Sequence, residues 1–258
     1  MKPTQSSSCA ATVILLLSLC FSPRTWAATV SLNPSADAFV TTGPSGNLAN
    51  NNYGGGGALS VAAQGLAQGE FQSLLQFGLS TARNSFDSQF GAGQWSIQSV
   101  SLQLTAAPPN NGVFNASTAG QFSLSLMLNN AWTEGTGTPS APTTTGITFS
   151  TLNSFVSATD ESLGIFGFSG ATSGATTYAL NLTPTLSEDI LTGSVASLRM
   201  FAADNTVSYL FDSRSFNTAS AHPLLNITAV PEAGALVLNV CGFGLLAGCR
   251  LRFRKARK

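Results

Sequence analysis

Few residues in this chain could act as catalytic nucleophiles or bases, because it has one histidine and its cysteines lie near the two ends. A Ser-His-Asp triad would have to use His222, the one histidine of the sequence, and no Gly-x-Ser-x-Gly turn is present. The four cysteines lie near the two ends of the chain, at Cys9, Cys20, Cys241 and Cys249. Residues 28–230 therefore contain no thiol, which excludes thiol catalysis and thiolate metal sites from that region.

Carboxylates are the remaining candidates for acid–base chemistry. A glycosidase needs two carboxyl groups that face one glycosidic bond. We expect Asp160-Glu161 to be a charged pair in a loop and Glu188-Asp189 to belong to a short helix, so neither pair is predicted to be catalytic. Calcium is a candidate cofactor, because aspartates bind it through carboxylate oxygens. Its candidate ligands are Asp37, Asp160, Asp204 and Asp212.

Aromatic side chains beside loops could bind sugar rings by stacking. Tyr53 lies in a glycine-rich segment, and Trp95 and Trp132 border predicted loops. Two of them also have a structural explanation, since Tyr53 could fill its loop and Trp132 could anchor a loop to the core. Arg214 lies in a region poor in basic residues, so we expect it to pair with a carboxylate near the final strands.

The charge of the chain is divided unevenly between its segments. The net charge is zero, but six of the 11 basic residues lie in residues 250–258. Residues 28–230 hold three arginines, no lysine and ten acidic residues, a formal charge of −7. Phosphate binding needs clustered Lys and Arg, so this region is not expected to bind nucleic acid.

Residues 1–27 have the pattern of a secretory signal peptide. Lys2 supplies a positive charge, residues 10–21 are largely apolar, and Pro23 is followed by the small residue Ala27. We predict cleavage after Ala27 and export of the remainder. A retained N-terminal anchor is the alternative, which the shortness of the apolar stretch disfavours.

Residues 230–258 predict a membrane tether. Val230, Pro231 and Glu232 precede an apolar run, 233–249, and a basic tail, 250–258. A helix over that run would be ~25 Å long, the short end of a bilayer span, and the arginines would keep its end in the cytoplasm. This order resembles the PEP-CTERM sorting signal of Gram-negative bacteria, with Ala233 where a second proline is usual. The resemblance implies tethering and then cleavage by the sorting protease exosortase.

Between these segments, residues 28–229 predict one all-β domain. Apolar and polar residues alternate in short runs, the pattern of strands with one buried face, and clusters rich in Gly, Asn and Pro separate the runs. Alternating runs are 36–40, 71–77, 100–104, 122–128, 178–182 and 225–227, and more continuous apolar runs are 195–202 and 208–212. Ten to twelve such strands indicate an antiparallel β-sandwich or jelly roll.

One short helix is predicted within this domain. Thr183 suits its N-cap, Pro184 suits its first turn and Gly193 suits its end. Leu186, Ile190 and Leu191 would form its apolar face.

Four pieces of residues 28–229 are similar to the DNRLRE family of bacterial surface proteins. They follow the family order: an opening "ADA-aromatic … NYG", an "L-x-F-D-L" strand, a "W-x-E-G … G-I-T-W" loop and a closing "S-R-E … P-x-L-x-I". The matching residues are 36–40 with 52–54, 74–79, 132–135 with 143–148, and 211–214 with 223–227. Gly78, Phe149 and Ser215 replace the usual Asp, Trp and Glu. The resemblance implies a β-sandwich related to carbohydrate-binding modules.

We therefore expect an exported, non-enzymatic protein of the cell surface or extracellular matrix that binds exopolysaccharide. A secreted polysaccharide-active lyase or glycosidase is one alternative, and a purely structural envelope protein is another.

Overall fold

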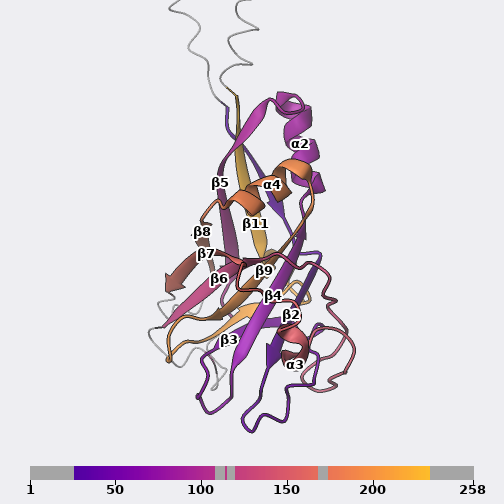
Figure 1. Ribbon diagram of the computed structural model, residues 1–258, viewed down its shortest axis with the longest axis vertical. Coiled ribbons are helices and arrows are strands. Elements are labelled where there is room, and N and C mark those ends of the chain that lie inside the picture. Colours follow the sequence, from indigo (N-terminus) through magenta and orange to yellow (C-terminus); the bar gives the residue numbers. More distant parts are fainter. Residues whose placement is uncertain (1–25, 108–113, 115–119, 168–173, 233–258) are drawn as a thin grey trace, which may run out of the picture. The chain divides into compact units, whose positions relative to one another are not determined.

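In the computed structural model, strands form two β-sheets that face each other (Figure 1). The structure describes residues 26–107, 114, 120–167 and 174–232. Residues 28–229 form one compact unit. Eleven strands occur among the described residues, within the predicted range of ten to twelve.

The smaller sheet has four strands and the larger has seven. The smaller follows the order β1 (Ala28–Leu32), β11 (Leu224–Pro231), β5 (Trp95–Thr105) and β8 (Ala175–Leu180). The larger follows the order β10 (Ser208–Asp212), β3 (Ala58–Ala62), β4 (Phe71–Gly78), β9 (Val195–Ala202), β6 (Gln121–Met127) and β7 (Glu161–Gly167), and β2 (Ala36–Thr41) pairs with β4.

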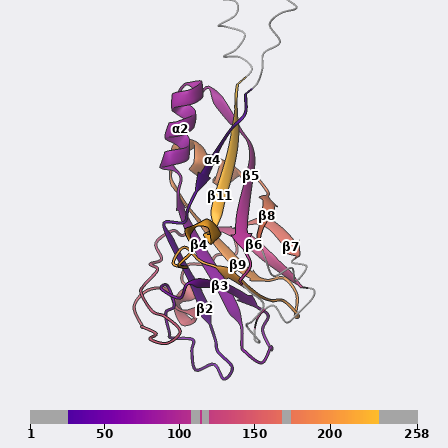
Figure 2. The ribbon, with the colours of Figure 1, turned by 180° about the vertical axis from the view of Figure 1, so that it is seen from behind.

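Strand pairing is antiparallel in both sheets. Val30 of β1 lies opposite Ile227 of β11, and the two strands run side by side in the view from behind (Figure 2). In the larger sheet, Asp37 of β2 lies opposite Leu75 of β4, and Phe39 lies opposite Ser73. The predicted antiparallel sheets are confirmed at this level.

The main core fills the space between the sheets. Leu102 of β5 and Ile227 of β11 belong to the same apolar cluster as Phe77, Leu124 and Leu198 of the larger sheet. A second, smaller cluster lies around α3 (Phe149–Leu152) and consists of Ala38, Val40, Leu74, Met127, Trp132, Ile147 and Leu152. Alternation along β2 explains this second cluster, because Ala38 and Val40 point to one face and leave Asp37 and Phe39 on the other.

The predicted helix is present as α4 (Pro184–Thr192). Thr183 caps it by accepting a hydrogen bond from the Leu186 amide, and Gly193 ends it in the left-handed conformation. Leu186 and Ile190 are buried. The expectation for Leu191 was wrong, because its side chain remains 43% exposed.

A longer helix, α2 (Ser80–Phe90), was not predicted. Its sequence is mostly polar, and no side chain caps its first turn. Ala82 and Phe86 bury its inner face, and the helix is stabilised by this tertiary packing rather than by propensity. Figure 1 shows α2 and α4 at one end of the sandwich and α3 at the other.

Glu161 is not in a loop as expected, since it opens β7. Its carboxylate accepts hydrogen bonds from the hydroxyl of Thr185 at 2.7 Å and from the Thr185 amide at 3.3 Å, in the first turn of α4. Hydrogen bonds from Thr183 and Thr185 hold the pKa of Glu161 below its usual range.

Among the described residues, no helix is long and apolar enough to cross a membrane, and the predicted span 233–249 lies outside them.

Candidate functional site

The first feature of the site is a group of hydrogen-bonded polar residues around Asp37, a buried residue of β2. Asp37 is 1% exposed, and its Oδ2 atom accepts a hydrogen bond of 2.7 Å from the main-chain amide of Arg214. Its Oδ1 atom is buried and has no hydrogen-bond partner among the residues that the structure describes. Burial raises the pKa of Asp37 to about 7, although the hydrogen bond from Arg214 opposes this shift. The carboxyl group is therefore poised to titrate near neutral pH.

An ion pair lies directly beside Asp37. The Arg214 Nε atom donates to Glu134 Oε1 at 2.8 Å, and its Nη2 atom binds Glu134 Oε2. The same Oε1 atom accepts the main-chain amide of Asp37 at 3.1 Å. The hydrogen bonds from Arg214 to Glu134 raise the pKa of Arg214. The prediction that Arg214 pairs with a carboxylate is confirmed, but the carboxylate comes from the loop after β6 and not from the final strands.

Asn52 fixes the same loop from the other side. Its Nδ2 atom donates to the carbonyl oxygens of Glu134 and Ile147 at 2.6 and 2.7 Å. Its Oδ1 atom accepts the amides of Gly54 and Gly137 at 3.2 and 3.1 Å. One buried side chain thus joins the segment after β2 to the segment between β6 and α3. Asp37, Asn52, Glu134 and Arg214 together are called the polar cluster below.

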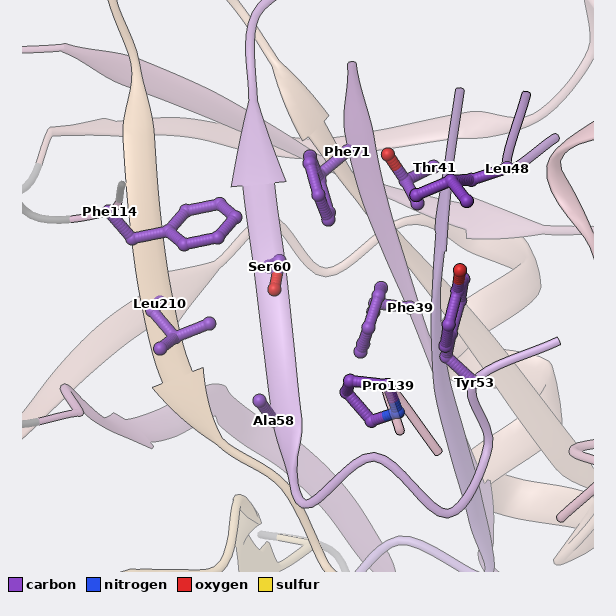
Figure 3. A pocket seen from close by; sticks show the side chains of 10 residues that line it. All are labelled: Phe39, Thr41, Leu48, Tyr53, Ala58, Ser60, Phe71, Phe114, Pro139 and Leu210. Carbon is purple, nitrogen blue, oxygen red and sulfur yellow. The ribbon is translucent and has the colours of Figure 1, made fainter. Parts of the chain in front are cut away.

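The second feature is an open hollow of about 320 Å³ that begins on the same face of β2 (Figure 3). Phe39 and Tyr53 stack at its edge with their ring centroids 4.7 Å apart and their planes 6° from parallel. Phe71 meets Phe114 edge to face at 5.0 Å. The residues that line the hollow are Phe39, Thr41, Leu48, Tyr53, Ala58, Ser60, Phe71, Phe114, Pro139 and Leu210.

Strand alternation explains how β3 forms part of this hollow. Leu59 and Val61 enter the main core, so Ala58 and Ser60 face the hollow instead. In Figure 3 the rings of Phe39 and Tyr53 lie on one side of β3, and Phe114 and Leu210 lie on the other. The lining is mainly apolar, with a few hydroxyl groups from Thr41, Ser60 and Tyr53.

The same two segments, β2 and the residues around Asn52, contribute to both the polar cluster and the hollow. Asp37 and Phe39 are two residues apart on β2 and therefore point to the same face. Asn52 immediately precedes Tyr53, whose hydroxyl accepts a hydrogen bond of 3.1 Å from Asn51. The polar cluster thus holds the segment that carries the Tyr53 ring.

The three aromatic residues predicted to bind sugar lie in three different environments. Tyr53 is 4% exposed and lines the hollow. Trp95 is 3% exposed, packs on Phe86 and donates its indole N–H to Asp87 at 2.8 Å. Trp132 is equally buried in the second core cluster and donates to Ser197 at 3.0 Å. Of the three, Tyr53 lines the hollow, whereas the two tryptophans belong to the core clusters.

The four candidate calcium ligands are not brought together as one site. Asp160 accepts the amides of Leu128 and Ser157, and Asp204 accepts those of Gln121, Thr206 and Val207. Asp212 is buried, which raises its pKa. Within the described part of the chain, no three His, Cys, Asp or Glu side chains are placed to hold a metal ion.

The residues named for processing lie at the borders of the described region. Ala27 is exposed and precedes β1. Val230 and Pro231 are the last two residues of β11, and Glu232 follows them.

His222, the candidate for a catalytic triad, places its Nε2 atom 2.8 Å from the carbonyl oxygen of Phe216.

Several residues of the site received no predicted role, although Phe39, Asn52 and Glu134 lie in the pieces that resemble the DNRLRE family. Phe39, Phe71 and Phe114 line the hollow, and Asn52 and Glu134 complete the polar cluster. Alternation along β2 could have paired Phe39 with Asp37, but nothing local indicates that Phe71 and Phe114 meet.

Comparison with known proteins adds no relative to this description. No family model matches the chain, and no curated protein matches it.

Proposed function

We propose that this protein is an exported β-sandwich of the jelly-roll type that is tethered to a membrane and binds extracellular polysaccharide without modifying it. The observation that carries the binding proposal is the open hollow beside Tyr53, which combines stacked aromatic rings with a few hydroxyl groups. Pockets for small ligands typically have this composition, and their volumes begin near the value found here. Aromatic rings can pack against the C–H faces of sugars while hydroxyl groups bind their polar edges.

The sequences of the two terminal segments support the proposed export and membrane tethering. Residues 1–27 have the pattern of a signal peptide, and residues 230–258 have that of a PEP-CTERM sorting signal. We propose that exosortase cleaves near Pro231-Glu232 and that the domain then reaches the cell surface or the extracellular matrix. The formal charge of −7 over residues 28–230 fits a domain that does not dock on anionic lipid itself.

The resemblance to the DNRLRE family gains a physical explanation from the polar cluster. Asp37 and Asn52 come from its first piece, Glu134 from its third and Arg214 from its fourth. The second piece, residues 74–79, lies largely in β4, which pairs with the strand that carries Asp37. This convergence supports the resemblance, because residues far apart in sequence have one shared structural task.

Polysaccharide binding is tested by co-sedimentation of the full-length protein, in mild detergent, with polysaccharide from the producing cells. Ala58→Phe should fill the hollow and abolish binding, because Ala58 lines it. Ala203→Phe is the matched control, since this exposed alanine is not part of the lining. Filling the hollow is a cleaner test than Tyr53→Ala, which would also remove the stacking on Phe39. Equal binding by the two variants would exclude the hollow, and absence of binding by the wild type would leave the structural role.

One observation favours a polysaccharide-active enzyme as the second candidate. Asp37, with its pKa near 7, lies beside Glu134, and glycosidases use a protonated and an ionised carboxyl group together. Asp37 is 1% exposed and Glu134 is bound by Arg214, so we place this candidate second. Release of reducing sugar from the polysaccharide, lost on Asp37→Asn, would establish it over the non-enzymatic proposal.

A further inference from the structure

The composition of the hollow indicates which sugars it selects. We infer that it takes one neutral sugar residue that carries a methyl or acetyl group, such as a 6-deoxyhexose or an acetylated hexose, in preference to a uronic acid or an unsubstituted hexose. This inference rests on the proposed function and narrows its ligand class.

The absence of a cationic partner argues against an acidic sugar. None of the ten described residues that line the hollow is Asp, Glu, Lys, Arg or His. A carboxylate or sulfate group that enters such a surface loses hydration without gaining an ion pair, which is strongly unfavourable.

The arginines of the domain do not offer a substitute, because each has another partner. Arg83 pairs with Asp87, Arg214 pairs with Glu134, and Arg199 donates to Gln72 while its guanidinium lies 4.3 Å from the Phe201 ring centroid. Residues 28–230 contain no other basic residue except His222. Their ten acidic residues would also repel a polyanionic chain at low ionic strength.

The apolar walls argue against a fully hydroxylated sugar. Phe39, Phe71, Phe114 and Leu210 supply much of the lining. The lining has only three hydroxyl groups, and two of them already accept one hydrogen bond each, Thr41 from the Gly43 amide at 2.9 Å and Tyr53 from Asn51 at 3.1 Å. A hexose with hydroxyl groups on every carbon would leave some of them without partners, whereas a methyl or acetyl group would contact the aromatic rings.

The small size of the hollow favours a single sugar residue as its ligand. About 320 Å³ is at the small end of ligand pockets. We therefore expect the hollow to bind a chain end or one substituted residue of a chain, and not a long stretch of polymer.

The test is calorimetric titration of the full-length protein, in mild detergent, with four neutral or acidic probes of equal length. These are oligomers of rhamnose, N-acetylglucosamine, glucose and glucuronic acid. We expect the first two to bind at least tenfold more tightly than the last two, because one methyl-sized group in an apolar pocket changes affinity by about 10- to 200-fold. Ala58→Phe should abolish this preference, and Ala203→Phe should leave it intact.

The outcomes separate this inference from the proposed function. Equal affinity for all four oligomers, or preference for the glucuronic acid oligomer, would overturn the selectivity while polysaccharide binding stands. A preference that survives in Ala58→Phe would assign it to another surface and also overturn the inference. If neither these probes nor the polysaccharide of the producing cells binds, the proposed function fails as well.

Discussion

Asp37 gives the domain an unusual dependence of stability on pH. The pKa of Asp37 is about 7 in the folded protein, compared with an ordinary value of 3.8 for an aspartate in the unfolded chain. Between pH 3.8 and pH 7 the folded protein therefore binds more protons at this carboxyl group than the unfolded chain does. The contribution of Asp37 to the free energy of unfolding should therefore be fully present below pH 3.8 and be lost as the pH rises to about 7. Asp37→Asn cannot titrate, so its stability relative to the wild type should increase by at least ~1 kcal/mol between pH 5 and 8. Urea unfolding at several pH values measures this difference, and a constant difference would contradict it.

The pair of Glu134 and Arg214 should matter more than an ordinary surface ion pair. The Glu134 side chain is only 16% exposed, and its carboxylate also accepts the amide of Asp37. Glu134→Gln should lower the free energy of unfolding by about 2 kcal/mol, because it leaves a partly buried guanidinium without its counter-charge. Arg83→Gln is the matched control, since Arg83 pairs with Asp87 at the surface and should cost under ~0.5 kcal/mol. If both variants lost a similar amount of unfolding free energy, the ion pair of the polar cluster would stabilise the domain no more than a surface ion pair does.

At the scale of elements, the close approach of two loops determines where the polar cluster forms. A Cβ atom on Gly137 would overlap the carbonyl oxygen of Asn52, so this glycine is required for the contact. Gly137→Ala should destabilise the domain by about 1–3 kcal/mol, because a backbone atom cannot rotate away as a side chain can. Gly78→Ala is the control, since a Cβ atom there would contact nothing within 4 Å. Thermal unfolding of both variants tests this, and equal melting temperatures would contradict it.

The elements that the sequence predicted are those with a strong local signal. Alternation identified strands such as β2, β4 and β6, and the cap at Thr183 with the glycine at Gly193 identified α4. α2 was missed because its sequence is mostly polar, so that the helical spacing of its few apolar residues, such as Ala82 and Phe86, is a weak signal. The hollow itself was not predicted, and the sequence analysis named only Tyr53 among its lining residues, since the other walls come from strands that meet through tertiary pairing.

At the scale of the whole molecule, the second core cluster, the polar cluster and the proposed binding hollow meet in one region of the larger sheet. β2 contributes Ala38 and Val40 to the second core cluster, Asp37 to the polar cluster and Phe39 to the hollow. A change in the polar cluster should therefore reach the hollow through this strand and through the segment from Asn52 to Tyr53. Binding and unfolding measurements on the same variants would reveal this coupling, since a ligand specific to the folded state raises its stability.

Removal of residues 233–258 should release the protein into the medium in a folded form. Every residue of the two described core clusters lies between Ala28 and Ala229, so the deletion removes none of them. The melting temperature should change by less than about 2–4 °C, the equivalent of 1 kcal/mol for a domain of this size. Circular dichroism and membrane fractionation after a salt wash measure the two effects. A matched deletion of residues 250–258 retains the apolar run and should stay with the membrane. If the longer deletion also remained in the membrane fraction, the attachment would belong to another part of the chain and the tether proposal would be wrong.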